Sequence, residues 1–268
     1  MCRLAIVLVL LGVPLTAAAA EPAALVRART LYNAGNYEAA IEAASTARND
    51  PRASDAAALV FARALLERFR AGSASERNGD LLAARAALAG IRPASLSGRD
   101  QLDLLIGLGQ TLYFGESYGA AADVFDSALG RSLLLADGDR AKLLDWWATA
   151  LDRQALTRPA DRRTPIFQRI VDRMQAELRQ EPGSAIANYW LVVGARGAGD
   201  LDRAWDAAVA GWVRAGVGSE AADLRAELDR LVTEALIPDR ARTRPSREQA
   251  EAATAMRSEW DAVKSGWK

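Results

Sequence analysis

The stretch YNAGNYEAAIEAASTA, residues 32–47, decides the fold of this chain of 268 residues. It is an alanine-rich helical sequence interrupted at Gly35 and Asn36, although a glycine inside a helix costs about 1 kcal/mol relative to alanine. Small and apolar residues recur three or four positions apart on both sides of the interruption. Gly35 therefore lies between two short helices, where a positive φ is useful, and not inside a single helix.

The same pattern returns at 105–128 and at 191–211. In each copy a first helix ends at a glycine-containing break. A second helix then opens with a large apolar or aromatic residue, and alanine follows three positions later. In the order of small residue on the first helix, opening residue and alanine, the three sets are Ala28, Tyr37 and Ala40; Gly109, Tyr118 and Ala121; and Val192, Leu201 and Ala204.

This alternation resembles the tetratricopeptide repeat family, whose unit is a pair of antiparallel helices in about 34 residues. The resemblance covers residues 22–215 and departs from the family pattern at Val192, where a smaller residue is usual. It implies an all-α fold, a right-handed superhelical solenoid of about five helical hairpins. The domain prediction is a helical repeat array over 21–215. An all-α bundle with accidental helical pairs is the alternative.

Two degenerate units fill the gaps between the clear copies. The first predicts helices over about 55–70 and 79–91, separated by a polar stretch. The second predicts a helix through Leu144 and Leu151 and another from Thr164 to Leu178. Thr164 is expected to cap the latter helix, with Pro165 in its first turn.

Beyond residue 215 the pattern changes. Residues 219–237 predict a charged amphipathic helix that ends at Pro238. A short basic loop containing Arg240, Arg242 and Arg244 is expected to follow. These features separate the C-terminal part from the repeat array.

Residues 216–268 are therefore expected to form C-terminal capping helices, because the last units of a stack need a polar outer face. Ser246 and Gln249 predict a capping box for the last helix. Trp260 and Trp267 are expected to add to the stack.

Residues 1–20 predict a secretory signal peptide. Arg3 precedes the apolar run LAIVLVLLGVPL (4–15), and small residues lead to a cleavage site between Ala20 and Glu21. A membrane anchor is the weaker alternative, because the run is too short to cross about 30 Å of hydrocarbon and contains Pro14. We expect an exported protein, periplasmic or secreted, with no stable membrane anchor after cleavage.

Composition excludes much chemistry. Lys+Arg and Asp+Glu are 34 each, so no general attraction to nucleic acid is expected. There is no histidine, and the single cysteine, Cys2, lies in the predicted signal peptide. Catalytic triads, Cys-His pairs and histidine or thiolate metal sites are thereby ruled out. We expect no enzyme, no cofactor and no metal. A carboxylate-dependent glycan-acting enzyme is a remaining alternative, with Asp145 or Asp152 acting with Glu116.

Function is expected from the concave groove, which the first helices line in tetratricopeptide repeats. The resemblance implies a scaffold whose groove binds another protein or a peptide, and a structural adaptor in cell-envelope assembly is the alternative. Aromatic residues there either anchor the partner or pad contacts between units. The residues that clamp a terminal carboxylate in some relatives are not reproduced, and only Asn33 and the arginines hint at them. The candidate groove residues are Arg29, Tyr32, Asn33, Gln110, Tyr113, Phe114, Asp152, Arg153, Tyr189 and Arg196.

The tryptophans are expected in the core. Trp205 and Trp212 are seven residues apart, two helical turns, so they project from one helix face. Packing against the C-terminal helices would bury them, and we expect the same of Trp146 and Trp147, because aromatic area is usually buried.

Overall fold

The structure is a computed structural model that describes residues 20–72, 77–135, 137–216 and 221–267. The predicted signal peptide, apart from Ala20, lies outside the described residues. The described part is all-helical and contains no strand, which confirms the predicted fold class at that level. The α-helices are α1 (Ala23–Asn33), α2 (Tyr37–Ala47), α3 (Ser54–Ala71), α4 (Arg77–Ala89), α5 (Gly98–Phe114), α6 (Tyr118–Leu129), α7 (Asp137–Leu156), α8 (Thr164–Gln180), α9 (Ala185–Gly197), α10 (Leu201–Ala215), α11 (Ala221–Leu231), α12 (Ile237–Arg242) and α13 (Gln249–Gly266).

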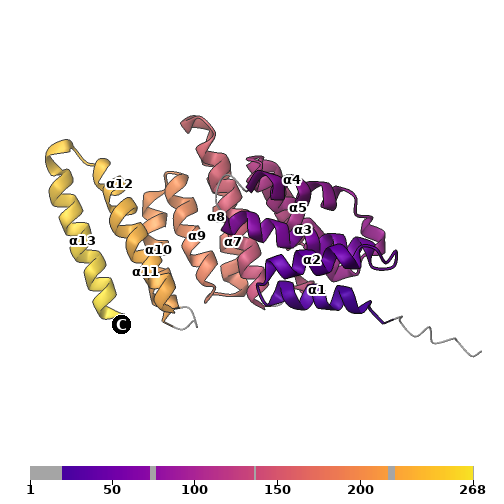
Figure 1. Ribbon diagram of the computed structural model, residues 1–268. Helices are drawn as coiled ribbons and strands as arrows, with labels where there is room; N and C mark the ends of the chain where they lie inside the picture. Colours follow the sequence, from indigo (N-terminus) through magenta and orange to yellow (C-terminus); the bar gives the residue numbers. More distant parts are fainter. Residues whose placement is uncertain (1–19, 73–76, 136, 217–220, 268) are drawn as a thin grey trace, which may run out of the picture.

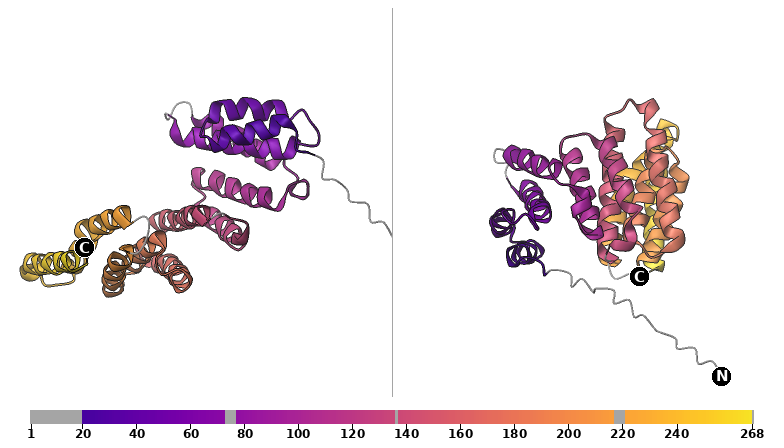
Figure 2. Two further views of the ribbon diagram at one scale, coloured as in Figure 1. Left: turned by 90° about the horizontal axis from the view of Figure 1, so that it is seen from below. Right: turned by 90° about the vertical axis from the view of Figure 1, so that its right-hand side faces the viewer.

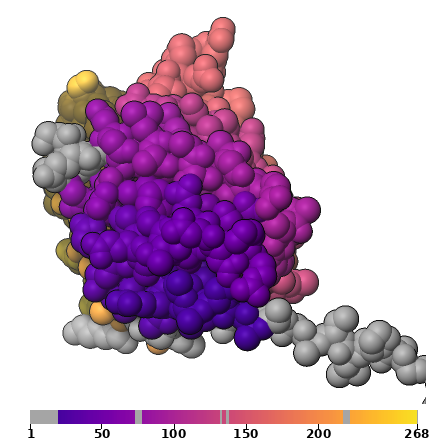
Figure 3. Space-filling model, turned by 45° about the vertical axis from the view of Figure 1, so that its right-hand side comes forward, coloured from indigo at the N-terminus to yellow at the C-terminus, as the bar shows by residue number. Residues whose placement is uncertain are grey.

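Short 3₁₀ turns lie in four of the connections, at η1 (Pro93–Ser95), η2 (Ser132–Leu134), η3 (Ala160–Arg162) and η5 (Ser246–Glu248). The connection at η3 forms the tip of the α7–α8 hairpin, which projects beyond its neighbours (Figure 3). The predicted helices over 55–70 and 79–91 are confirmed as α3 and α4.

Helices that follow each other in sequence pack against each other. The pairs include α1 with α2, α3 with α4, α5 with α6 and α9 with α10. Figure 1 shows them side by side in an elongated row from α1 to α13. The first helix of a pair also contacts the first helix of the next pair: α1 contacts α3, α3 contacts α5, and α7 contacts α9. The row bends between its two ends (Figure 2).

Three interhelical breaks share one backbone geometry. Gly35 and Gly199 have φ values of 75° and 86°, and Glu116 occupies the same place with φ 61°. In each break the next residue donates its N–H to a carbonyl five residues earlier, which closes the turn as in a Schellman motif. These N–H···O distances are 3.0 Å from Asn36 to Leu31, 2.9 Å from Ser117 to Leu112 and 3.0 Å from Asp200 to Ala195.

The positions where the paired helices cross are fully buried and small. Ala28, Ala62 and Ala148 are 0% exposed, as is the larger Val192. At Gly109 an added Cβ would lie 2.4 Å from Cε1 of Phe125 on α6. Any larger side chain there would force the two helices apart, so glycine is needed for close approach and not for its backbone freedom.

The prediction that Pro238 ends a helix is wrong. After α11 the chain makes a π-helical turn at Val232–Leu236 and continues directly into α12, where Pro238 occupies the first turn. Proline lacks the N–H that a helix interior requires, but the first turn has no partner for that N–H. Arg240 and Arg242 consequently lie on a helix, and not in the basic loop expected from the sequence.

Two predicted caps are also wrong. α8 begins at Thr164 itself, and its N-cap Arg163 makes no side-chain capping bond. Ser246 lies in the 3₁₀ turn before α13, where Gln249 Nε2 donates to the Arg244 carbonyl at 3.1 Å. In both places a 3₁₀ turn leads directly into the helix and is closed by a backbone bond, from Arg163 N–H to the Ala160 carbonyl and from Glu248 N–H to the Pro245 carbonyl.

The largest hydrophobic core runs from α5 to α13. Trp260 is 0% exposed, and its ring lies 6.1 Å from Trp205 and 5.4 Å from Trp212 between centroids. Trp147 is also buried, whereas Trp267 is 57% exposed. The predicted packing of the Trp205 and Trp212 pair on the C-terminal helices is therefore confirmed, and of the two tryptophans expected to add to the stack only Trp260 does so.

No helix within the described ranges has both the length and the hydrophobicity needed to cross a bilayer. The boundary expected near residue 216 stays a prediction.

Candidate functional site

A cavity of about 800 Å³ lies among first helices of the row. Its walls come mainly from α1, α3, α5 and α7, with Tyr37 added from the start of α2. This volume is typical of sites that hold a ligand. The lining residues are Arg29, Tyr32, Asn33, Tyr37, Leu59, Val60, Arg63, Glu67, Arg70, Arg99, Asp100, Asp103, Ile106, Gln110, Asp139, Lys142, Leu143, Asp145 and Trp146.

Four of the predicted groove residues meet in this cavity: Arg29, Tyr32, Asn33 and Gln110. The first three lie on α1 and Gln110 on α5, more than seventy positions along the chain. Their meeting follows from the packing of α1 and α5 on either side of α3.

An ion pair joins α1 to α5 at the cavity wall. The Arg29 guanidinium donates Nη1 to Asp100 Oδ1 at 2.9 Å and Nη2 to Oδ2 at 3.0 Å. Burial opposes ionisation of Asp100, but the hydrogen bonds from Arg29 and Ser97 outweigh it and hold the pKa below its ordinary value. Two parallel N–H···O bonds make this the most specific ionic contact of the cavity.

A second ionic network links α3, α5 and α7. Arg63 Nη1 lies 2.8 Å from Asp103 Oδ2, and the Arg63 guanidinium also stacks over the Tyr32 ring, 4.8 Å from its centroid. Arg99 reaches Asp139 on α7 at 3.0 Å and Asp103 Oδ1 at 3.5 Å. Asp103 Oδ1 is buried and makes no hydrogen bond within the described part of the chain. Burial raises the pKa of Tyr32, so this phenol stays neutral.

Tyr113 and Phe114 do not line the cavity. Phe114 contacts Phe69 of α3 and Trp146 of α7, with ring centroids 4.9 Å and 5.7 Å away, and Tyr113 lies 5.2 Å from Trp146. These rings join neighbouring pairs of helices, which is the packing alternative stated above. Trp146 belongs to both groups, because it packs on the rings and also lines the cavity.

The other predicted residues lie further along the row, on α7 and α9, outside the cavity. Burial raises the pKa of Asp152 and of the half-buried Tyr189. Arg153 is exposed. Arg196 Nε lies 2.6 Å from Asp239 Oδ2 on α12, so this arginine ties α9 to the C-terminal helices. The structure thus places four of the ten expected groove residues in the cavity lining and six outside it.

The sequence interpretation missed the residues that organise the cavity, chiefly Arg63, Asp100 and Asp103. A signal for one of them existed. Asp103 precedes Gln110 by seven residues, two turns of a helix, and so shares its face. The partners across helices had no such local signal.

The acids considered for glycan chemistry are not brought together in the cavity. Asp145 lines it and accepts a hydrogen bond of 2.9 Å from Trp190 Nε1. Asp152 and Glu116 lie outside the cavity lining, and Glu116 is exposed in an interhelical turn. No group of three or more metal-ligating side chains occurs among the residues described.

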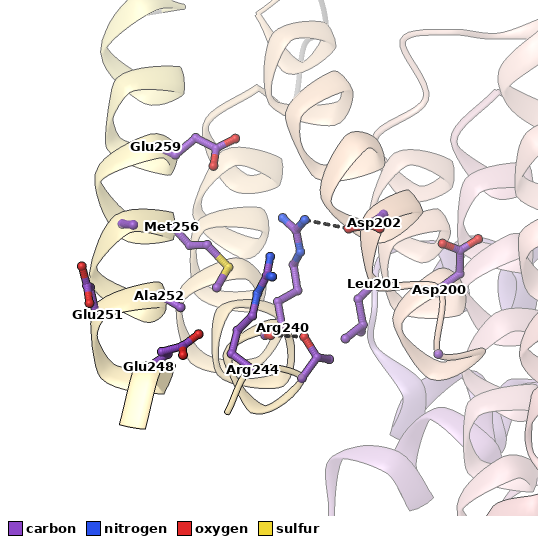
Figure 4. A pocket seen from close by; sticks show the side chains of 13 residues that line it. Asp200, Leu201, Asp202, Arg240, Arg244, Glu248, Glu251, Ala252, Met256 and Glu259 are labelled. Atoms are coloured by element: carbon purple, nitrogen blue, oxygen red, sulfur yellow. Dashed lines mark hydrogen bonds and ion pairs between the residues drawn. The ribbon is translucent and has the colours of Figure 1, made fainter. Parts of the chain in front are cut away.

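A second hollow, of about 930 Å³, lies between the start of α10, α12 and α13 (Figure 4). Arg240 reaches Asp202 at 2.7 Å and lies over Trp205, and Figure 4 shows Met256 pointing into the space. Most of its lining residues are exposed, whereas Asp100, Asp103 and Gln110 in the first cavity are buried. The first cavity is therefore the better-formed candidate site.

Comparison of the sequence with models of known protein families gives no match, and neither does comparison with functionally curated proteins. The geometry of the cavity is therefore the basis for assigning a function.

Proposed function

We propose that the protein is an interaction scaffold of the tetratricopeptide repeat type, a right-handed curved solenoid that holds a segment of a partner protein in the cavity among α1, α3, α5 and α7. One observation carries the proposal: successive first helices contribute polar and aromatic side chains to a single cavity of about 800 Å³. A segment several residues long can touch all of these helices at once, which suits recognition of an extended chain.

The repeated turns support the assignment of the fold. The left-handed residue recurs at Gly35, Glu116 and Gly199 with matching hydrogen bonds, and each precedes a second helix that packs on the first, at Ala28, Gly109 and the larger Val192 respectively. Such regular units bury one another and leave a continuous surface on the side of the first helices. The signal peptide predicted over residues 1–20 supports a function outside the cytoplasm.

The test is site-specific photocrosslinking in intact cells. A photoreactive residue at Asn33, exposed at the cavity, is compared with one at Glu42, exposed on α2. We expect a partner segment that is captured from Asn33 and not from Glu42. A synthetic peptide of that segment is then expected to bind the purified protein.

A cavity-filling substitution tests whether the peptide binds in the cavity. Ile106→Trp fills the cavity, and Leu82→Trp makes the same kind of change at a side chain on α4 that is 63% exposed. We expect Ile106→Trp to weaken binding of the peptide at least about tenfold, and Leu82→Trp to leave it unchanged. Equal capture from Asn33 and Glu42, or a peptide affinity that Ile106→Trp leaves unchanged, would refute the proposed function.

A further inference from the structure

The charges that line the cavity balance. Five cationic side chains face five carboxylates, so the lining carries no net charge. The cationic residues are Arg29, Arg63, Arg70, Arg99 and Lys142, and the acidic residues are Glu67, Asp100, Asp103, Asp139 and Asp145.

The deepest of these charges already have partners. Side-chain exposure is 30% for Arg29 and 8% for Asp100 in one pair, and 23% for Arg63 and 8% for Asp103 in another. A charged ligand group would have to separate such a pair and leave one member buried without its counter-ion, which is strongly unfavourable. The remaining cations, Lys142 above all, lie at the solvent-exposed rim, where water and salt weaken their attraction.

Gln110 is the uncharged buried polar side chain of the lining that no described residue engages, whereas Asp103, whose Oδ1 makes no hydrogen bond, is already paired with Arg63 through Oδ2. Its side chain is part of the lining, the residue is 8% exposed, and its amide makes no hydrogen bond to the described residues. A side-chain amide offers one acceptor and two donors, so it can pair with both the N–H and the carbonyl of a peptide group. Val60, Ile106 and Leu143 add apolar surface to the same walls.

We propose that the segment bound in this cavity is electrically neutral and that the Gln110 amide recognises one of its peptide groups. The Gln110 Oε1 accepts from the backbone N–H of the segment, and Nε2 donates to its carbonyl. This inference rests on the proposed function, because it specifies the chemistry of the partner segment in the same cavity. Gln110 is then a binding residue, and the ion pairs hold the walls of the cavity in place without contacting the segment.

The probe is a library of short random peptides, acetylated at the N-terminus and amidated at the C-terminus so that the ends carry no charge. The purified protein, its Gln110→Leu variant and its Gln180→Leu variant each select from this library. Gln180 is exposed at the end of α8, which makes it the matched control. Leucine keeps the volume of glutamine without its amide.

We expect the wild-type protein and Gln180→Leu to enrich peptides poor in Asp, Glu, Lys and Arg. Affinity for the best of them should change little between about 0.05 and 0.5 M NaCl, because no ion pair forms. Gln110→Leu should bind it about tenfold more weakly, as the loss of two hydrogen bonds predicts.

The outcomes separate the two proposals. Selection of charged peptides with salt-dependent affinity, or unchanged affinity in a folded Gln110→Leu, would overturn the neutral-segment inference and leave the scaffold function standing. Selection of no peptide by the wild-type protein would remove both.

Discussion

The two ends of the row differ in the side chains that form their buried cores. At the N-terminal end, between α1 and α3, the buried core is small and consists largely of alanines. Ion pairs then connect helices that are distant in sequence, as Arg29 does with Asp100. At the C-terminal end, α10 to α13 close around Trp205, Trp212 and Trp260 within the largest core of the structure.

This contrast follows from side-chain size. Alanine lets two helices approach closely but buries little apolar area per residue, whereas each tryptophan buries about 150–250 Å². Helices that meet through alanines leave room at their edges, and long polar side chains fill it. The cavity among α1, α3, α5 and α7 is lined by such side chains, and the tryptophan-rich end supplies an apolar anchor.

The largest expected effect comes from removing the centre of that anchor. Trp260→Ala deletes a side chain that is 0% exposed and whose Nε1 donates to Asp229 at 2.7 Å. We expect a loss of about 3–5 kcal/mol in the free energy of unfolding, measured by urea denaturation.

Trp267→Ala is the matched control, because Trp267 is 57% exposed. It should change the free energy of unfolding by no more than about 0.5 kcal/mol. If both variants lost similar stability, the tryptophan cluster would not be the anchor that the comparison assumes.

The second effect lies in the middle of the row. Gly109→Ala places a Cβ 2.4 Å from Phe125 Cε1, so α5 and α6 must separate. We expect a loss of about 3 kcal/mol, because overpacking forces strain on both helices. Phe125→Leu should recover part of that loss in the Gly109→Ala background, while Phe125→Leu alone destabilises. Additive losses in the double variant would show that the two residues do not touch.

The helices and the breaks between them were largely predictable because their signals are local. The break at Gly35 needs a positive φ, and the tryptophans of α10 share a face, so a short window of sequence contains each cause. The cavity was predictable only in part. Arg29 and Asp100 are 71 positions apart, and Arg196 meets Asp239 through packing of α9 on the C-terminal helices. No short window of sequence contains both members of such a pair.

The third effect is a difference between the two ends in their stability at low pH. The Asp100 pKa is below its ordinary value of 3.8, so Arg29 stabilises the fold above that pH, and the stabilisation is lost as the pH falls through the lower folded value. We expect amide hydrogen exchange to rise first in α1 and α5 below about pH 4, with α10 and α13 protected longer. The Asp229 pKa is also lowered by Lys264, but its side chain is 40% exposed and contributes less.

Asp100→Asn should cost about 1–2 kcal/mol at neutral pH and remove most of this early acid response. The exposed Asp161 provides the control, and Asp161→Asn should keep the response of the parent protein. Simultaneous acid opening of both ends in the parent protein would contradict an ionic N-terminal end.

The smallest effect tests the turn that both ends share. Glu116 has φ 61°, where Gly35 and Gly199 hold the equivalent places, and a non-glycine residue there costs about 1–2 kcal/mol. Glycine relieves that strain but adds freedom to the unfolded chain. We therefore expect Glu116→Gly to raise the free energy of unfolding by about 0.5–1 kcal/mol, measured by thermal and urea denaturation.

The reverse changes, from glycine to alanine, should lower the free energy of unfolding at both Gly35 and Gly199. Gly35→Ala and Gly199→Ala have open space around the new Cβ, so their expected loss of about 1 kcal/mol comes from φ alone. Gly183→Ala also has open space and has no positive φ, so it should be neutral or slightly stabilising. Equal losses at Gly35 and Gly183 would mean that the left-handed turn is not what these glycines provide, and the three breaks would no longer be equivalent.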